Sequence, residues 1–443
     1  MPRVTVCGKR LRISWGGCTL SKTNWLSLGD CCTFENGDRG NNYPSKTDFC
    51  DSGVPFLNGG NIVDNRLTGN DYDYISYQKF KSLRAGKVQE GDLLFCLRGS
   101  IGKCAISNLE VAAIASSLVI IRCLPNLLPQ YLYYVLISSY FQKSIANSDN
   151  GSVQGNISVA YLSTMKVPVP SLSVQRHIVG VLSSIDNKIE NNRKLMTELE
   201  DTARLVYEEW FCRFDFPDAQ GRPYRSSGGR MIWSGKLKRE IPEGWDISAV
   251  ADLVKYERGY SYSSNDLSDD GYPMISLASI DRKHHYRPEE LKHLRQAPIE
   301  KDLAKPGEML LACTDLTRLA EIIGCPIKVP HGLGCPAFSM DLARLDVSSD
   351  KIDDWYLYMT LRTDAYHEFI KQFASGTNVL HLNLDGLKWF QIPVPIRSIQ
   401  DRFGELAETL WSRGDEAMRE SQQLASLRNC LLPMLINGQA TIE

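Results

Sequence analysis

A segment near residue 151 recurs near residue 376, and this repeat constrains the fold more than any other feature of the chain. Residues 151–175 read GSVQGNISVAYLSTMKVPVPSLSVQ, and residues 376–400 read GTNVLHLNLDGLKWFQIPVPIRSIQ. A Gly, a Leu, a Pro-Val-Pro triplet, a Ser and a Gln coincide without a gap. Such self-similarity at a fixed spacing indicates one structural unit that occurs twice.

Earlier segments extend the repeat. VPFLNGGNI at 54–62 matches YPMISLASI at 272–280, and EGDLLFC at 90–96 matches PGEMLLAC at 306–313. In both copies, short β-rich runs alternate with clusters of Gly, Asn and Asp, which is typical of a curved sheet with long polar loops. One helix is expected over residues 130–145 and its counterpart over 353–370. The pattern predicts two mixed α/β domains.

A long apolar heptad follows each Pro-Val-Pro triplet, in alternating steps of four and three, as at the a and d positions of a coiled coil. Ser173 and Gln175 stand where the first helix would begin. An ordinary long helix packed on its own domain is one alternative, but two such helices after matching domains favour an antiparallel pair that holds the domains apart. The expected seam consists of Ile178, Leu182, Ile185, Ile189, Asn192, Met196 and Leu199, then Phe403, Leu406, Leu410, Arg413, Ala417, Leu424 and Leu427.

The predicted fold is therefore α+β, with two domains separated by a long antiparallel two-helix coiled coil in a pseudo-two-fold repeat. The expected boundaries are an N-terminal extension at 1–20, a first domain at 21–170, a first spacer helix at 171–213, a connector at 214–240, a second domain at 241–396, and a second spacer helix with a C-terminal tail at 397–443.

Composition limits the class of protein. Of 443 residues, 43% are hydrophobic, enough for two ordinary cores, and the net charge of −2 shows no overall basic character. The 13 cysteines have no paired spacing, which fits reduced thiols in a cytosol. No apolar run approaches the roughly 20 residues of a membrane span. We expect a soluble, cytoplasmic protein with no membrane partner.

Several motifs together resemble the DNA-specificity subunit of type I restriction-modification systems. They are EGDLLFCLRGSIGK at 90–103, QGNIS at 154–158 with its PVPSLSVQ continuation, WFCRFDFPDAQGRPYRSSGG at 210–229 leading to IPEGW, and LLPMLINGQ at 431–439. The resemblance covers roughly residues 25–440. It implies that each domain is a target-recognition domain that reads one half of a bipartite sequence in double-stranded DNA.

The same resemblance implies the partners and cofactors. The helix pair would dock two modification subunits, which carry S-adenosylmethionine and methylate adenine. Restriction subunits that use ATP and Mg would translocate and cut DNA. No cofactor and no metal is expected in this chain, because it lacks a phosphate-binding loop, an S-adenosylmethionine motif and paired metal-ligand spacing. We therefore expect a non-enzymatic subunit that serves DNA methylation and phage defence.

A domain that recognises a DNA sequence needs hydrogen-bond donors and acceptors on loops that can enter a groove of the duplex. In the first domain, RGSIGK and QGNIS offer this mixture; in the second, the matching segments read TDLTRLAEIIG and VLHLN, and a basic cluster follows Asp281. The alternatives are a turn with solvated charges and polar caps of the next element. The candidates are Arg98, Ser100, Lys103, Gln154, Asn156, Ser158, Arg282, Lys283, Thr314, Arg318, Thr377, Asn378, His381 and Asn383.

A second function remains open from the sequence. A pseudo-symmetric coiled-coil scaffold could bind proteins, rather than DNA, through its two globular domains. The two hypotheses differ in salt dependence, because neutralising phosphates makes affinity fall steeply with salt and apolar docking does not.

Overall fold

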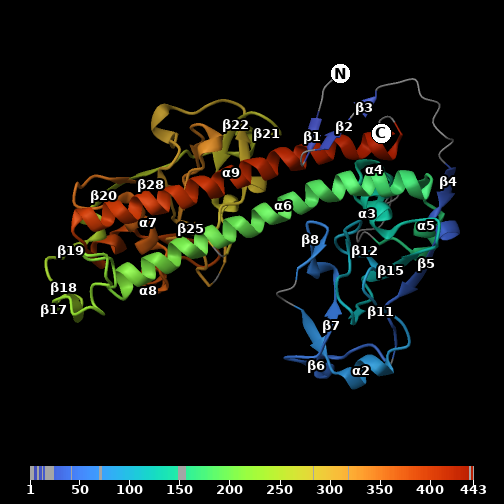
Figure 1. Ribbon diagram of the computed structural model, residues 1–443, viewed down its shortest axis with the longest axis horizontal. Coiled ribbons are helices and arrows are strands. Elements are labelled where there is room, and N and C mark those ends of the chain that lie inside the picture. The colour runs from blue at the N-terminus through green and yellow to red at the C-terminus, as the bar shows by residue number, and fades with distance from the viewer. Residues whose placement is uncertain are drawn as a thin grey trace. The chain divides into compact units, whose positions relative to one another are not determined.

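The structure is a computed structural model that describes residues 4–6, 9–11, 13–14, 24–40, 42–68, 72–147, 156–282, 284–317, 319–438 and 441–442. The chain forms two compact units: Met1–Glu190 with Gln422–Glu443, and Asn191–Ser421. Both units mix strands with helices, as the sequence predicts (Figure 1). Two long helices, α6 (Leu172–Tyr207) and α9 (Arg397–Ile436), each contribute one part to either unit.

An antiparallel sheet in the order β13-β12-β15-β5 forms the centre of the first unit. A second sheet has the order β11-β14-β7-β10-β6, with β14 and β7 parallel. Strands β4 and β16 pair beside them. The strands are β4 (Asn24–Ser27), β5 (Cys32–Asn36), β6 (Phe49–Cys50), β7 (Val54–Leu57), β8 (Ile62–Val63), β9 (Arg66–Leu67), β10 (Asp73–Ile75), β11 (Lys87–Val88), β12 (Leu93–Cys96), β13 (Cys104–Ile106), β14 (Ala112–Ile114), β15 (Leu118–Cys123) and β16 (Lys166–Val169).

The second unit repeats these pairings. Its central antiparallel sheet has the order β26-β24-β28-β20, and its other sheet has the order β21-β23-β22-β27 with β22 and β27 parallel. Strands β19 and β31 pair as β4 and β16 do. The strands are β17 (Met231–Ser234), β18 (Arg239–Pro242), β19 (Asp246–Ala249), β20 (Val254–Arg258), β21 (Leu267–Ser268), β22 (Tyr272–Ile275), β23 (Lys292–Leu294), β24 (Met309–Ala312), β25 (Thr314–Asp315), β26 (Pro326–Lys328), β27 (Ala337–Phe338), β28 (Leu342–Val347), β29 (Ala374–Ser375), β30 (Leu380–Leu382) and β31 (Gln391–Val394).

Short pairs occur at the two chain ends. Strands β1 (Val4–Val6) and β2 (Lys9–Leu11) pair with each other, and β3 (Ile13–Ser14) pairs with β32 (Thr441–Ile442). Two short helices of the first unit are α1 (Leu28–Cys31) and α2 (Tyr77–Ser82).

Each helix that the sequence predicts between the sheets is in fact two helices. In the first unit, α3 (Pro129–Ile137) ends before Ser138, whose hydroxyl accepts a hydrogen bond from the backbone N–H of Phe141 and so starts α4 (Ser139–Ala146). In the second unit, Thr363 starts α8 (Asp364–Ile370) after α7 (Asp354–Leu361) in the same way. The single-helix prediction was wrong because a side-chain N-cap interrupts the apolar pattern.

The start of α6 packs on the end of α9 within the first unit. Leu182 and Ile185 are fully buried and share one apolar cluster with Leu431 and Leu435 of α9. On the flank of this contact, a guanidinium nitrogen of Arg428 lies 2.7 Å from a carboxylate oxygen of Asp186. Because the first turns of one helix meet the last turns of the other, the two segments run antiparallel in this unit.

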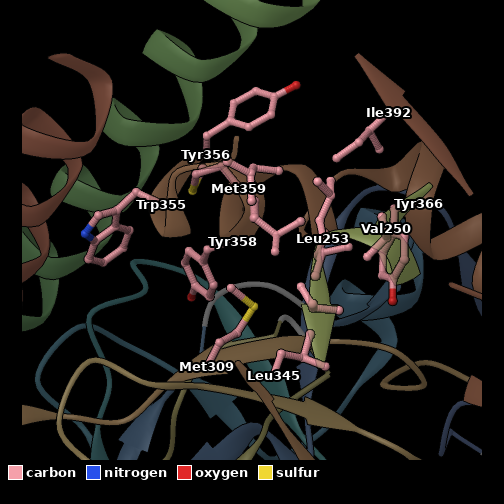
Figure 2. Close-up of a cluster of buried hydrophobic side chains, with 14 of the residues drawn as sticks. Val250, Leu253, Met309, Leu345, Trp355, Tyr356, Tyr358, Met359, Tyr366 and Ile392 are labelled. Atoms are coloured by element: carbon pink, nitrogen blue, oxygen red, sulfur yellow. The ribbon is translucent and has the colours of Figure 1, made fainter. Parts of the chain in front are cut away.

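The opposite ends of the two helices meet within the second unit. Phe211, just after α6, lies edge-on to Phe403 near the start of α9, with ring centroids 5.2 Å apart. Asn192 is buried, and its amide donates to the backbone oxygen of Ala417 at 3.2 Å. Figure 2 shows the neighbouring core, in which Tyr358 of α7 lies near Met309 of β24.

The buried face of α9 differs in part from the expected seam. Arg413 is exposed, and Leu406 and Leu410 are only half-buried, whereas Ala407, which the expected seam omits, is buried. The physical reason is that α9 also packs on α7, where the indole of Trp355 donates to Glu408 at 2.9 Å. A helix with two neighbours needs a wider apolar face than a two-helix seam. The other seam residues expected on α6 and α9 are buried or half-buried: Ile178, Leu182, Ile185, Ile189, Asn192, Met196, Leu199, Phe403, Ala417, Leu424 and Leu427.

The Gln that ends the sequence repeat fixes the first helix to its sheet domain. Gln175 is fully buried in the first turn of α6, which begins at Leu172, next to the start expected from the sequence. Its side-chain oxygen accepts from the backbone N–H of Leu128 at 2.8 Å, and its amide nitrogen donates to the backbone oxygens of Asn126 and Pro170. One side chain thus joins α6 to the turn that begins α3.

Gln400 makes the same three bonds in the second unit. It accepts from the backbone N–H of Asp353 at 2.7 Å and donates to the backbone oxygens of Lys351 and Pro395. A buried tyrosine reinforces each junction, since Tyr131 donates to the oxygen of Pro168 and Tyr356 to that of Pro393. The recurring Pro-Val-Pro and Gln therefore have a structural explanation.

None of the helices among the described residues combines the length and apolar character needed to cross a membrane.

We expect Gln400→Leu to destabilise the second unit by about 1–3 kcal/mol, because it leaves one backbone N–H and two backbone oxygens without these partners. Urea unfolding followed by tryptophan fluorescence, to which Trp245 in the core of this unit contributes, measures the change. Gln423→Leu is the matched control, because Gln423 is exposed on the same helix. Equal midpoints for the two variants would contradict the structural role of Gln400.

Candidate nucleic-acid interface

The first candidate loop connects β12 to β13. Gly99 and Gly102 both have positive φ, at 75° and 87°, so the chain turns tightly here in a conformation that glycine permits at little cost. Arg98 and Ser100 are exposed, whereas Lys103 is half-buried. The loop thus presents a guanidinium and a hydroxyl to solvent.

The second candidate segment of this unit lies against that loop. Arg98 and Asn156 form an isolated antiparallel bridge, and Nε of Arg98 donates to Oδ1 of Asn156 at 3.2 Å. Asn156 is itself exposed. Ser158 accepts from the N–H of Tyr161 at 3.1 Å as the N-cap of α5 (Val159–Thr164), so its hydroxyl has the capping role named above as an alternative. Gln154 lies outside the described residues.

The matching loop of the second unit follows β24 and is longer. Thr314 sits in β25 opposite His381 of β30, at the place that corresponds to Arg98 opposite Asn156. Thr314 is 4% exposed, so its hydroxyl cannot reach a nucleic acid from this position, and its assignment as a DNA contact is corrected. Thr314 belongs to an edge strand, because β25 pairs with β30 alone in the sheet order β25-β30-β29.

Asp315 organises this longer loop and was not predicted from the sequence. Its carboxylate is fully buried and accepts from the backbone N–H groups of Thr317 at 2.6 Å and Ile322 at 2.8 Å. The segment from Asp315 to Ile322 carries Leu316 and Leu319, which are 69% and 76% exposed. An Asp two residues before a Thr is a common turn signal, but its bond to Ile322 depends on the fold.

Exposed polar groups lie beside this loop, on the segment around β30. Thr377, Asn378 and His381 are all exposed. Asn383 is also exposed, and it caps a short 3-10 helix by accepting from the N–H of Asp385 at 3.0 Å, as Ser158 caps α5. The fold therefore brings the two predicted segments of the second unit together, as in the first.

The basic cluster after Ile280 is largely engaged with acidic groups. Arg282 is exposed, with its Nε 3.2 Å from a carboxylate oxygen of Glu321, so it lies beside the loop that contains Leu316. Lys283 and Arg318 lie outside the described residues.

His285 ties this segment to α6. Its ring nitrogens lie 3.2 Å from a carboxylate oxygen of Glu200 and 3.3 Å from one of Asp281. Hydrogen bonds to Asp281 and Glu200 raise the pKa of His285 to about 9 against the opposing effect of burial. Burial acts to raise the pKa of Glu200, but His285 and the adjacent guanidinium of Arg362 lower it on balance.

The raised pKa makes the stability of the second unit depend on pH. The contribution of protonated His285 is fully present below its unfolded pKa of about 6.5 and is lost as the pH rises through about 9. We expect the urea midpoint of this unit to fall more between pH 6.5 and 9.5 for the natural chain than for His285→Gln. His293→Gln is the control, and parallel pH profiles of natural chain and His285→Gln would refute the assignment.

Comparisons with known proteins agree with this architecture. Residues 22–201 match a family model described as the type I restriction modification DNA specificity domain. The chain is 23% identical over 403 residues to the type I restriction enzyme MjaIX specificity subunit of Methanocaldococcus jannaschii, covering 86% of this chain and 87% of that one. It is 21% identical to the HindI specificity subunit of Haemophilus influenzae, covering 93% and 100%.

A solved structure shows a similar fold. The type I restriction-modification S subunit from M. genitalium aligns with a TM-score of 0.55 at 16% identity, covering 95% of this chain and 98% of that chain.

Proposed function

We propose that this chain, which belongs with the DNA-specificity subunits of type I restriction-modification systems, recognises a bipartite DNA target with one half-site for each sheet domain. Its role in DNA recognition follows from the family. The observation that carries the finer proposal is the repetition of one strand order with dissimilar exposed loops at the same places. Two domains with the same strand order and different loop sequences are suited to recognising two different DNA sequences.

In this proposal, Arg98, Ser100 and Asn156 face one half-site. Thr377, Asn378 and His381 face the other, together with Arg282. Bidentate amides and guanidinium groups discriminate base edges in the major groove, and the exposed leucines of the second loop could contact thymine methyl groups. The near-neutral chain would depend on partner subunits to complete a basic channel around the duplex.

The long helices would form one antiparallel coiled coil between the domains, as the boundaries expected from the sequence require. This pseudo-two-fold element would set the gap between half-sites and dock two modification subunits. The chain would supply recognition rather than chemistry: S-adenosylmethionine would bind to the modification subunits, and ATP with Mg to the restriction subunits.

We expect Arg98→Ala to weaken DNA binding by the complex with modification subunits by about 1–3 kcal/mol if the guanidinium contacts a base. Fluorescence anisotropy with a duplex that contains the target, repeated at several salt concentrations, measures the loss. Arg84→Ala is the control, because Arg84 is an exposed arginine of the same unit that follows α2. Unchanged affinity would remove Arg98 from the interface. DNA affinity without steep salt dependence would favour a protein-binding scaffold instead.

The spacer role predicts the effect of adding one heptad to both long helices, after Glu190 and after Ser421. Seven residues preserve the phase of an apolar seam and lengthen each helix by about 10 Å. The unspecified gap should grow by about three base pairs at about 3.4 Å each, while both half-sites stay the same. Methylation-sensitive sequencing of DNA modified by the complex reads the gap.

A chain with the heptad in α6 alone is the control, since its helices can no longer keep their register, and we expect it to lose modification. Retained methylation with an unchanged gap in the doubly lengthened chain would contradict the spacer role.

A further inference from the structure

Three potential metal ligands from distant parts of the sequence meet in the second unit. A ring nitrogen of His284, a ring nitrogen of His367 and the sulfur of Cys325 all lie within 4.8 Å of one another. Cys325 is 2% exposed, and the two imidazoles meet edge to face with centroids 5.1 Å apart. Nitrogen and thiolate ligands in this combination suit a borderline-soft divalent cation such as Zn²⁺.

Each imidazole is oriented by a backbone carbonyl. Nε2 of His284 lies 2.9 Å from the oxygen of Glu321, and Nε2 of His367 lies 3.0 Å from the oxygen of Ala320. A carbonyl oxygen can only accept, so each Nε2 carries the proton and each Nδ1 keeps a lone pair. Histidines that bind metals are commonly fixed in this manner, with the distant N–H given to a carbonyl.

The thiol has no comparable partner. Sγ of Cys325 donates only a long, weak hydrogen bond to the backbone oxygen of Glu321, at 3.9 Å. His284 adopts a positive φ of 66°, which is uncommon for a residue with a side chain and requires the surroundings to hold it there. The cluster therefore contains a loosely bonded thiol beside a backbone held in an unfavourable conformation.

The residue of the first unit that corresponds to His367 shows how this position restrains a loop. Gln142 of α4, which corresponds to His367 of α8, donates from its amide to the oxygen of Gly102 at 2.9 Å and so holds the recognition loop. His367 holds the longer loop through Ala320. A longer loop has more freedom to lose on ordering, so an additional restraint is useful in the second unit.

We propose that His284, His367 and Cys325 bind one Zn²⁺ ion, with water as the fourth ligand, and that this ion joins the segment containing Arg282 to the loop containing Leu316 and Leu319. The proposal that these residues bind Zn²⁺ does not depend on the proposed function. The proposal that the ion positions loops for DNA recognition does rest on the proposed function. Ligand atoms of tetrahedral zinc lie about 3.5 Å apart, so the three side chains would close by up to about 1 Å.

The positive charge of Arg362 opposes the ion, as does that of the protonated His285 next to His284. The buried guanidinium of Arg362 lies beside the cluster, but it is paired with the carboxylate of Glu200 and contacts the hydroxyl of Tyr358 at 2.9 Å. The thiolate of Cys325 would further reduce the local positive charge once the metal displaces its proton.

The test uses the purified full-length chain, stripped with a chelator and titrated with Zn²⁺ or Co²⁺ alone. We expect one equivalent to bind, and the Co²⁺ form to show tetrahedral bands with a thiolate charge-transfer band. Cys325→Ser should abolish the charge-transfer band, and His367→Gln should weaken binding by more than about 10-fold. Cys335→Ser and His293→Gln are controls from the same unit, outside the cluster, and should bind as the natural chain does.

Failure of the natural chain to bind Zn²⁺ with one-to-one stoichiometry would overturn the proposal, as would a charge-transfer band that survives Cys325→Ser. Circular dichroism of each variant separates lost binding from lost folding. If a variant unfolds, the Co²⁺ spectrum of the natural chain still decides, because octahedral bands without sulfur character contradict a His₂Cys site. Altered DNA recognition without altered metal binding would fault the proposed function and leave the metal site standing.

Discussion

Burial of one amide side chain at each junction is the constraint on which the rest of the structure depends. Gln175 and Gln400 satisfy three backbone groups each, at the point where a sheet domain passes into a long helix. A buried amide left without partners is costly, so the direction of the helix relative to its own domain is determined by hydrogen-bond geometry. The same hydrogen bonds therefore also determine how the loops of each domain are oriented relative to its long helix.

The loop sequences differ between the two units although the strand pairings that support the loops are the same. Residues that correspond in the two units, Arg98 and Thr314, lie opposite Asn156 and His381 in equivalent backbone pairings, yet one is exposed and the other buried. Backbone pairing specifies where each loop begins but does not specify which side chains emerge from it. Exposed loop residues such as Arg98 can change at little cost to stability, because they contribute little to the core, whereas a change at the buried Thr314 also affects packing.

Much of the fold was predictable because its signals are local or repeated. The internal repeat predicted two α/β units, and the heptad pattern after each unit predicted two long helices. Both signals can be found without knowing which distant residues are in contact. The breaks at Ser138 and Thr363 were missed because one capping hydroxyl overrides an apolar pattern. Arg413 was misplaced because the second neighbour of α9, helix α7, cannot be seen from one helix alone.

The candidate site was less predictable, since its arrangement depends on contacts between distant segments. Sequence reasoning proposed both loops as candidates, but the burial of Thr314 and the hydrogen bond from Ile322 to Asp315 become evident only in the folded structure. Metal-ligand spacing gave no signal, because His284, Cys325 and His367 come from three separate elements. Residues that act together only after folding leave no linear pattern, so in this protein the frame can be predicted from the sequence while the chemistry of its loops requires the structure.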